Sequence, residues 1–295
     1  MNITFQVEID NSKFENFSNI IKFAYKTAME IGRKIVLNYL QNKDQEIKES
    51  RDKKRYRSKG KRKTCIKTIL GDIEYEREVY IDKASPETVS HVYLLDEELK
   101  INRVGHVSEE ICQYIASSIC VTTYRDTARQ IAEITDMSIS AQGVWNITQA
   151  MGAEQKKVIE RHTELAKDNK SVGELESKIL YEENDGIWLA LQGKDRKENG
   201  KSKEMKVGIA YDGVREKQVG KTKRRILADK VAYASFEPAA VFRKHKEGLI
   251  RSRYNTDETD VRVINGDGAQ WIFGNEECKY KFWINSTGIK CCVLV

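Results

Sequence analysis

The most constraining stretch of the sequence runs from Asp260 to Ile272 and reads DVRVINGDGAQWI. Its apolar run, 261–264, has the composition of a buried strand, and the strand must stop where Asn, Gly, Asp and Gly follow. Glycine on both sides leaves the Asp267 carboxylate accessible and lets a ligand approach closely, which suits a hard metal ion or a phosphate-bearing substrate. Asp267 is therefore the first candidate site residue. A plain structural turn is the alternative, because Asp-Gly pairs are common turn residues.

A second Asp-Gly pair, Asp185 and Gly186, lies inside the strand-like segment 178–192, KILYEENDGIWLALQ. Two further strand-like segments follow at 204–212 and 228–236. A helix is then predicted from Pro238 to about Tyr254, since proline is tolerated in a first turn, before the strand 261–264. Aspartates at the ends of neighbouring strands can hold two magnesium ions about 4 Å apart. We therefore expect Asp185 and Asp267 to be catalytic residues and ligands of Mg²⁺.

The first hundred residues predict a small α+β module, 1–104. Alternating apolar residues indicate a short strand at 3–9, and apolar residues at helical spacing predict an amphipathic helix over about 13–40. Two β-prone segments, 64–70 and 73–81, are joined by Gly71 and Asp72, a pair that favours a tight hairpin, and a third strand is expected at 91–95.

The next region, 105–170, predicts three helices with helix-turn-helix spacing. They begin near Ser108, Thr123 and Ser140, residue types that cap helices. In the third helix we expect Val144, Trp145, Ile147 and Met151 to face inward. The exposed stripe is then Gln142, Asn146 and Gln149, whose amides can contact adenine edges. A helical bundle with no role in DNA binding has the same spacing.

Positive charge is concentrated in two runs, although the net charge is only +6. The first run, 51–63, has Lys or Arg at nine of thirteen positions and is expected to be a loop; the second covers 217–225. Such patches suit a polyanion, and solvated loops or a disordered linker are the alternative. The residues expected to contact DNA are Arg51, Lys53, Lys54, Arg55, Arg57, Lys61, Arg62 and Lys63 in the first run and Lys223, Arg224 and Arg225 in the second.

The six cysteines show no CxxC spacing and the histidines no paired pattern, which argues against a zinc site. No apolar run is long enough to span a bilayer, and the start, MNITFQVEID, does not read as a secretion leader. A cytoplasmic location without a membrane partner is therefore expected.

Three segments together resemble the ISLre-type insertion-sequence transposases. They are the basic run leading into RKTCIKTILGDIEYEREVYIDK, the helical TTYRDTARQIAEITDMSISAQGVWNI, and YASF followed by VINGDGAQWI. The resemblance extends to about Ile272. It implies that 171–295 is an α/β ribonuclease-H-like domain of the acidic-triad (DDE) class, with Asp185 and Asp267 as the first two acids and Glu182 or Glu183 open to confusion with Asp185.

The third acid of that class is a glutamate on a helix well downstream. The last segment here, GNEECKYKFWINSTGIKCCVLV, does not resemble the family's continuation, and Glu276 and Glu277 lie too close to Asp267 to replace that glutamate. The resemblance therefore implies a C-terminally truncated copy with an incomplete catalytic domain.

The expected function is that of a DNA transposase, which cuts and joins the ends of its own element by two-metal phosphoryl transfer, here as a catalytically defective copy. Its partner is double-stranded DNA, and a homo-oligomer is left open. The alternative is a non-catalytic DNA-binding protein acting on the same ends. A third reading is a metal-dependent nuclease that completes its site with Glu183 or Asp212, although Asp212 is more simply a turn residue.

Overall fold

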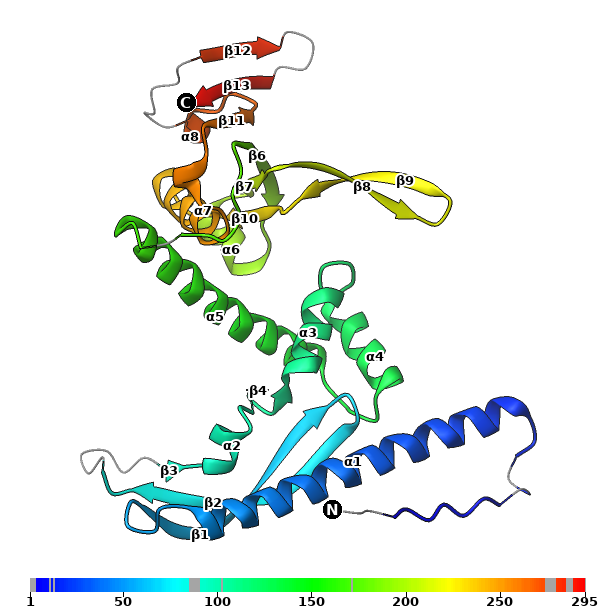
Figure 1. Ribbon diagram of the computed structural model, residues 1–295. Coiled ribbons are helices and arrows are strands. Elements are labelled where there is room, and N and C mark those ends of the chain that lie inside the picture. Colours follow the sequence, from blue (N-terminus) through cyan, green and yellow to red (C-terminus); the bar gives the residue numbers. More distant parts are fainter. Residues whose placement is uncertain are drawn as a thin grey trace. The chain divides into compact units, whose positions relative to one another are not determined.

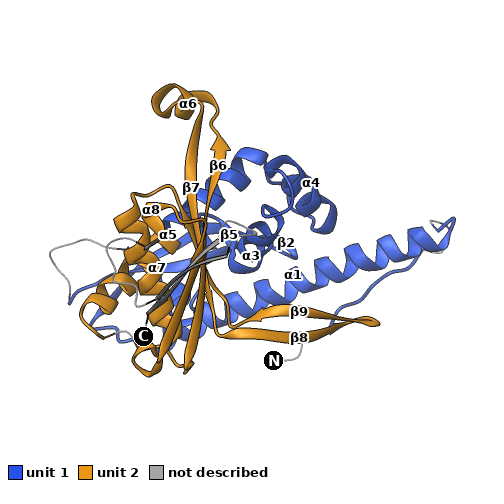
Figure 2. Ribbon diagram, turned by 90° about the horizontal axis from the view of Figure 1, so that it is seen from above, with its two compact units in different colours: residues 1–153 blue, residues 154–295 orange. Residues whose placement is uncertain are grey.

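The protein is a mixed α+β structure whose chain divides into two compact units, 1–153 and 154–295 (Figures 1 and 2). The computed structural model describes residues 4–10, 12, 14–84, 91–101, 103–170, 172–273, 280–284 and 289–294, with side chains as far as Ile272. Within these ranges, no helix combines the length and the apolar character needed to cross a membrane.

The first unit begins with a 34-residue helix, α1 (Phe17–Ser50), whose first turn is capped by Asn16 through the Asn19 N–H. The helix packs on a five-stranded sheet of order β3-β2-β1-β5-β4. The strands are β1 (Tyr56–Thr68), β2 (Gly71–Asp82), β3 (His91–Val92), β4 (Arg103–Val104) and β5 (Val107–Ser108), and a short helix, α2 (Leu94–Glu98), follows β3. Their shared core consists of Leu40, Ile47, Ile66, Ile73, Tyr75 and Leu95.

Three helices complete the first unit: α3 (Glu109–Ser118), α4 (Tyr124–Ile134) and the start of α5 (Ala141–Lys167), which runs on into the second unit. Thr123 caps α4 as predicted, because its hydroxyl accepts the Asp126 N–H at 3.2 Å. Ser140 accepts the Gly143 N–H at 3.0 Å, whereas Ser108 makes no side-chain cap. A separate core holds the helices together; it includes Ile111, Ile115, Ile131, Val144 and Ile147.

The second unit is built on a six-stranded sheet of order β10-β7-β6-β11-β13-β12. Its strands are β6 (Ile179–Ala190), β7 (Ser202–Tyr211), β10 (Val231–Ser235), β11 (Val261–Gly266), β12 (Tyr280–Ile284) and β13 (Ile289–Leu294). β6 pairs antiparallel with β7 but parallel with β11. The crossover between β10 and β11 contains the helix α7 (Ala239–Arg253) and a 3₁₀ turn (Thr256–Glu258), and α7 covers one face of the sheet.

Shorter elements decorate this sheet. A helix, α6 (Gly193–Asn199), joins β6 to β7, and α8 (Gln270–Phe273) follows β11. The strands β8 (Gly213–Val219) and β9 (Thr222–Ala228) form a two-stranded ribbon that extends away from the sheet (Figure 1).

The strands β6, β7, β10 and β11 and the helix α7 are predicted correctly, whereas β8, β9, β12 and β13 are not predicted. Several other predictions are wrong. Residues 4–9 form no strand, and α1 begins at Phe17 and continues to Ser50. The basic run is largely the strand β1, which pairs with β2 along its length. The hairpin turn consists of Ile69 and Leu70 instead of the predicted Gly71 and Asp72, because Thr68 pairs with Gly71 across the two strands. Only His91 and Val92 form the third strand.

Candidate metal site and nucleic-acid surfaces

The two candidate aspartates follow residues that are paired across neighbouring parallel strands. Asn184 of β6 aligns with Gly266, the last residue of β11; Asp185 is the next residue of β6, and Asp267 is the first residue after β11. Neighbouring strands lie about 4.8 Å apart. Since side chains alternate along a strand, Asp185 belongs to the face opposite that of Glu182 and Asn184, which contact Lys246 of α7. Asp267 follows the strand, and both aspartates are exposed. The register thus brings together the two acids that the sequence singled out.

Each aspartate keeps one carboxylate oxygen available for a ligand. Asp185 Oδ1 accepts the Gly186 N–H at 2.8 Å, and Asp267 Oδ1 accepts the Ala269 N–H at 2.9 Å. The Oδ2 atoms make no hydrogen bond or ion pair with the described residues. Two exposed carboxylates with free oxygens fit magnesium, which prefers oxygen ligands and retains several waters.

A third ligand is not grouped with them in the described part of the chain, where no three His, Cys, Asp or Glu side chains are placed to hold a metal ion. Glu276 and Glu277 lie outside the described residues. Glu183 shares the face of Asp185, but its Oε1 accepts the Tyr211 hydroxyl at 2.6 Å. Asp212 lies 3.9 Å from Arg215 and has one buried oxygen without a partner.

The glycines around Asp267 have structural reasons of their own. A Cβ at Gly266 would come within 2.5 Å of the Ile272 side chain, because α8 folds back over the end of β11. Gly268 has a φ of +89°, a conformation that glycine adopts readily. The Asp267 hydrogen bond to Ala269 closes the same turn. The glycine pattern therefore does not require a ligand, and the case for a site rests on the strand register.

A buried ion cluster lies under the aspartates, on the α7 face of the sheet. Glu182 is 1% exposed and its carboxylate binds Lys246 Nζ at 2.8 Å and Arg262 Nη2 at 2.6 Å. Burial alone would raise the pKa of Glu182, but the two cations outweigh it and hold that pKa below its ordinary value. Arg262 also binds Glu247 at 2.8 Å. The cluster ties β6 and β11 to α7 directly behind the aspartate positions.

Two more residues that sequence reasoning missed join this region. Asn184 accepts a hydrogen bond from Lys246 at 2.8 Å, and its Nδ2 is buried without a partner. Glu204 of β7 lies over Gly186, where a Cβ would come within 2.3 Å of its Oε1. Glu204 also accepts the Trp271 indole N–H at 3.1 Å. Gly186 is the sequence signal that could have indicated the approach of Glu204, because an isolated glycine in a strand marks close approach by another group.

The first basic run divides into residues with structural roles and residues without them. Arg51 stacks over Tyr80 at 5.2 Å and its guanidinium bonds the Lys48 carbonyl, so it stabilises the end of α1. Arg55 binds Asp82 through two nitrogens, at 3.0 and 2.7 Å. Arg62 contacts the His91 ring at 3.3 Å. The exposed cations whose side chains make no hydrogen bond or ion pair with a described residue are Lys53, Lys54, Arg57, Lys59, Lys61 and Lys63.

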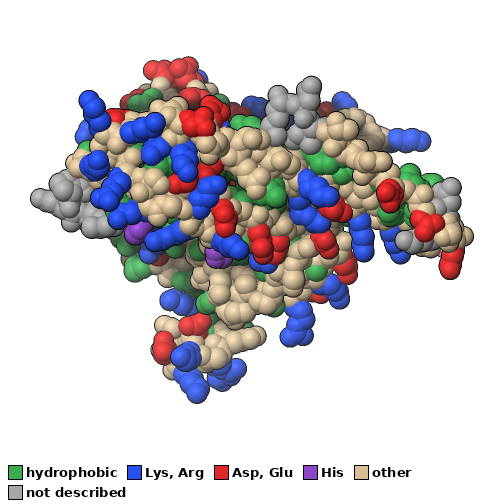
Figure 3. Space-filling model, turned by 90° about the horizontal axis from the view of Figure 1, so that it is seen from below, with side chains coloured by type: hydrophobic (Ala, Val, Ile, Leu, Met, Phe, Trp, Pro, Cys, Tyr) green, Lys and Arg blue, Asp and Glu red, His purple; other side chains and the backbone are tan. Residues whose placement is uncertain are grey.

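The second basic run is a two-stranded ribbon, and the ribbon divides its charges between two faces. Lys217 pairs with Arg224, so these two share one face, whereas Lys223 and Arg225 share the other with Glu216. Lys223 forms an ion pair with Glu216 at 3.0 Å. The predicted set Lys223, Arg224 and Arg225 therefore does not act as one patch, and the more cationic face is that of Lys217 and Arg224. In the view of Figure 3, Lys and Arg side chains are likewise spread widely with acidic side chains among them.

The amide stripe on α5 has the predicted exposure. Gln142, Asn146 and Gln149 are exposed, and Gln142 Nε2 donates to Asn146 Oδ1 at 3.0 Å. Trp145 was predicted to face inward, but it is 42% exposed. Trp145 is exposed because positions 142, 145, 146 and 149 lie on one side of a helix, so it shares the side of the three amides. The stripe thus combines three amides with an aromatic ring.

This chain is an α+β protein with paired aspartates on adjacent parallel strands and several cationic surfaces. It belongs to the uncharacterised protein family UPF0236, which it matches over residues 12–287. A UPF0236 protein of Caldanaerobacter subterraneus subsp. tengcongensis, TTE0610/TTE0881/TTE1053/TTE2432, is 25% identical over 263 residues, which is 88% of this chain and 50% of that protein. The UPF0236 protein in vanSb 3'region of Streptococcus gallolyticus is 24% identical over 214 residues, 72% of this chain and 42% of that protein. The chain spans about half the length of the curated relatives it matches first.

Proposed function

We propose that this protein binds double-stranded DNA and that its second unit derives from the phosphoryl-transfer domain of a DDE-type, ISLre-like transposase with a ribonuclease-H-like fold. The observation that carries the proposal is the parallel register of Asn184 with Gly266, which sets Asp185 beside Asp267. Three antiparallel strands, a crossover helix and a fourth strand parallel to the first support the fold assignment.

In this proposal Asp185 and Asp267 are two ligands of a magnesium site. When bound, Mg²⁺ would supply charge stabilisation for the oxygens of a phosphodiester and activate the attacking water or hydroxyl. The buried cluster of Glu182, Lys246 and Arg262 holds the two strands in register. The ribbon, the first basic run and the α5 stripe contact the DNA.

The name of another relative from Caldanaerobacter subterraneus adds support, because it joins eleven designations from TTE0033 to TTE2212. A protein carried at many places in one genome is what an element that copies itself produces. For the present chain the proposal includes the sequence-based expectation of a catalytically defective copy.

A magnesium-dependent strand-transfer assay on DNA with the element's terminal repeats tests this proposal. The chain is expected to bind the DNA but not to join it. Robust joining that disappears in Asp267→Ala would establish an active transposase and refute the claim of a defective copy. No binding at low salt would refute the DNA-binding function altogether.

The second candidate is a non-catalytic DNA-binding protein that never used the two aspartates. The hydrogen bond from Ala269 to Asp267 favours it, because that bond gives Asp267 a purely structural role in the turn. Titration with Mn²⁺, a paramagnetic substitute for Mg²⁺, separates the two candidates. Binding that is lost in both Asp185→Asn and Asp267→Asn supports the transposase origin, and no binding supports the simple DNA-binding protein.

A further inference from the structure

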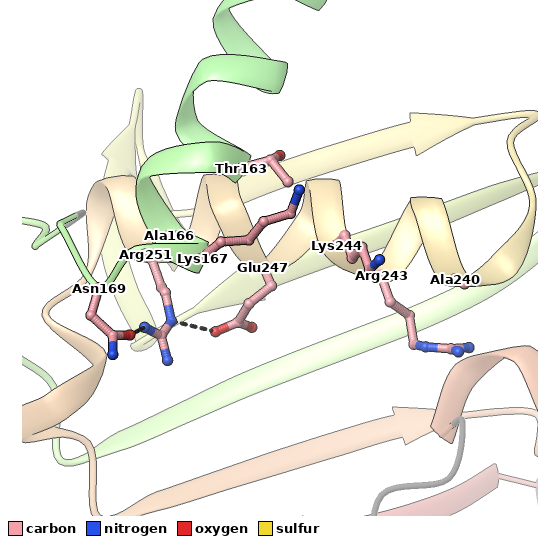
Figure 4. Close-up of a pocket in the computed structure, with 9 residues that line it drawn as sticks. All are labelled: Thr163, Ala166, Lys167, Asn169, Ala240, Arg243, Lys244, Glu247 and Arg251. Carbon is pink, nitrogen blue, oxygen red and sulfur yellow. Dashed lines mark hydrogen bonds and ion pairs between the residues drawn. The ribbon is translucent and has the colours of Figure 1, made fainter.

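The outer side of α7 in the second unit forms a cationic groove with the end of α5. The groove has a volume of about 400 Å³. Figure 4 shows its lining side chains along both helices. Those from α5 and the residues after it are Thr163, Ala166, Lys167 and Asn169, and those from α7 are Ala240, Arg243, Lys244, Glu247 and Arg251. The α7 residues recur at helical spacing, so they form one continuous stripe.

The two helices that form the groove touch beside it, at Gly248 of α7 and Thr163 of α5. A Cβ at Gly248 of α7 would come within 2.8 Å of the Thr163 Cα, so only glycine permits this separation. Thr163 is 5% exposed, and its hydroxyl donates to the Ile159 carbonyl at 2.8 Å. Long side chains stand on both sides of this contact along α7, and the groove lies between them and the end of α5.

The charges of the groove are unbalanced. Four of its lining side chains are cationic and only Glu247 is anionic. Glu247 is already neutralised, because it binds Arg251 at 3.1 Å and Arg262 at 2.8 Å, and Arg262 comes from the sheet. Arg243 Nη1 donates a hydrogen bond to the Trp271 carbonyl oxygen at 2.7 Å, and the other N–H groups of the guanidinium remain available for a ligand. Lys244 makes no hydrogen bond or ion pair with a described residue.

Lys167 does not remove this imbalance. Its Nζ lies 2.6 Å from Glu164, but both side chains are more than half exposed, and exposed pairs of this kind are weak. Arg251 is held by Glu247 and by Asn169, whose amide oxygen accepts from its Nη1 at 3.0 Å. An anion entering the groove would therefore meet three cations with available donors, Lys167, Arg243 and Lys244. Arginine and lysine in an open groove suit phosphate groups, which accept several charge-assisted hydrogen bonds.

We propose that this α5–α7 groove, whose cationic lining residues are Lys167, Arg243, Lys244 and Arg251, binds phosphate groups of a nucleic-acid backbone. Its elongated, exposed form and the excess of cations fit successive phosphates of a strand. The residues that line the groove include neither Asp185 nor Asp267, so it is separate from the aspartates. The inference deepens the proposed function, on which it rests, by giving the nucleic acid a second surface in this unit.

The test compares DNA binding by the full chain and by Lys167→Gln/Lys244→Gln, using fluorescence anisotropy of a labelled duplex across a salt series. The control is Lys157→Gln on α5, an exposed lysine paired with Glu154 outside the groove. The slope of log affinity against log salt falls by about 0.9 for each lost phosphate contact, so it should fall by about 1.8 in the double variant and much less in the control. Both groove lysines are exposed, so thermal unfolding should be unchanged.

Each outcome decides the matter. DNA binding by the wild type with an unchanged slope in the double variant overturns the groove but leaves the proposed function intact. If the wild type binds no DNA, the backbone proposal falls together with the DNA-binding function. A parallel titration with inorganic phosphate, read by thermal stabilisation, identifies the source of the ligand. Stabilisation that is lost in the double variant, without any DNA binding, would assign the groove to free phosphate and overturn the backbone assignment.

Discussion

At the level of single residues, the second unit depends on Glu182. A carboxylate that is 1% exposed between Lys246 and Arg262 is stable only while all three groups are charged together. Replacing a buried ion cluster entirely can be neutral, but removing one partner leaves buried charges uncompensated. Through these two ion pairs, Glu182 of β6 links its strand to β11 and to α7, close to the positions of the two aspartates.

Glu182→Gln should lower the free energy of unfolding by about 3–5 kcal/mol, the usual cost of breaking a buried pair. Urea unfolding monitored by circular dichroism measures this. The matched control is Glu183→Gln, the next residue on the same strand, which is exposed and can still accept the Tyr211 hydroxyl. Equal costs for the two variants would show that the cluster does not hold the strands together.

The lowered pKa of Glu182 also predicts how the free energy of unfolding depends on pH. The pKa of Glu182 in the folded protein lies below its ordinary value of 4.5, so its stabilisation is fully present above pH 4.5 and is lost as the pH falls through the folded pKa. The difference in urea midpoint between the wild type and Glu182→Gln should therefore shrink below pH 4.5. A difference that stays constant on acidification would contradict this assignment.

At the level of elements, the β8–β9 ribbon sorts its charges by face. Lys217 and Arg224 share the less neutralised face, whereas Lys223 on the other face is paired with Glu216. Lys217→Gln/Arg224→Gln should therefore reduce the salt slope of DNA binding by about 1.8, and Lys223→Gln/Arg225→Gln by less. Anisotropy titrations with a labelled duplex measure both slopes. Equal reductions would mean that the ribbon does not present one face to DNA.

Helix packing gives a second prediction at this level. Gly248→Ala places a methyl group within 2.8 Å of the Thr163 backbone, and such overpacking costs about 1–3 kcal/mol. Gly152→Ala is the control, because it lies in α5 with open space around it, and alanine there should stabilise by about 0.5–1 kcal/mol. Chemical unfolding of both variants measures the change in the free energy of unfolding, which should be a decrease for Gly248→Ala and an increase for Gly152→Ala. Stabilisation by Gly248→Ala would refute the close contact.

The elements also show what the sequence could and could not predict. β6, β7, β10, α7 and β11 were predictable because apolar residues recur in their sequences at strand or helix spacing, even though two of the buried residues of β6 are the polar Glu182 and Asn184. The ribbon and the first half of β1 were not, since their exposed Lys and Arg carry no alternation and only the backbone pairing holds them. The pairing of Asp185 with Asp267 followed from strand order, whereas Glu204 and Lys246 approach through tertiary contacts that no local pattern records.

At the level of the whole molecule, the proposed interaction with DNA and the proposed metal site depend on different residues. The cations with free charge are distributed over the first basic run, the ribbon and the α5–α7 groove, and the net charge is only +6. Binding that comes from dispersed cations is electrostatic, steeply dependent on salt and indifferent to magnesium. The two aspartates, in contrast, offer a cation oxygen ligands but repel a phosphate backbone in its absence.

The final prediction follows from this separation. Asp185→Asn/Asp267→Asn should abolish Mn²⁺ binding, measured by electron paramagnetic resonance, while DNA affinity in the presence of a chelator stays equal to that of the wild type or rises slightly, because two negative charges are removed. Asp195→Asn/Asp257→Asn is the charge-matched control, since both residues are exposed and neither lies at the aspartate pair. Loss of DNA affinity on chelation alone would show that a metal ion bridges protein and DNA, and the two functions would then have to be assigned to one site.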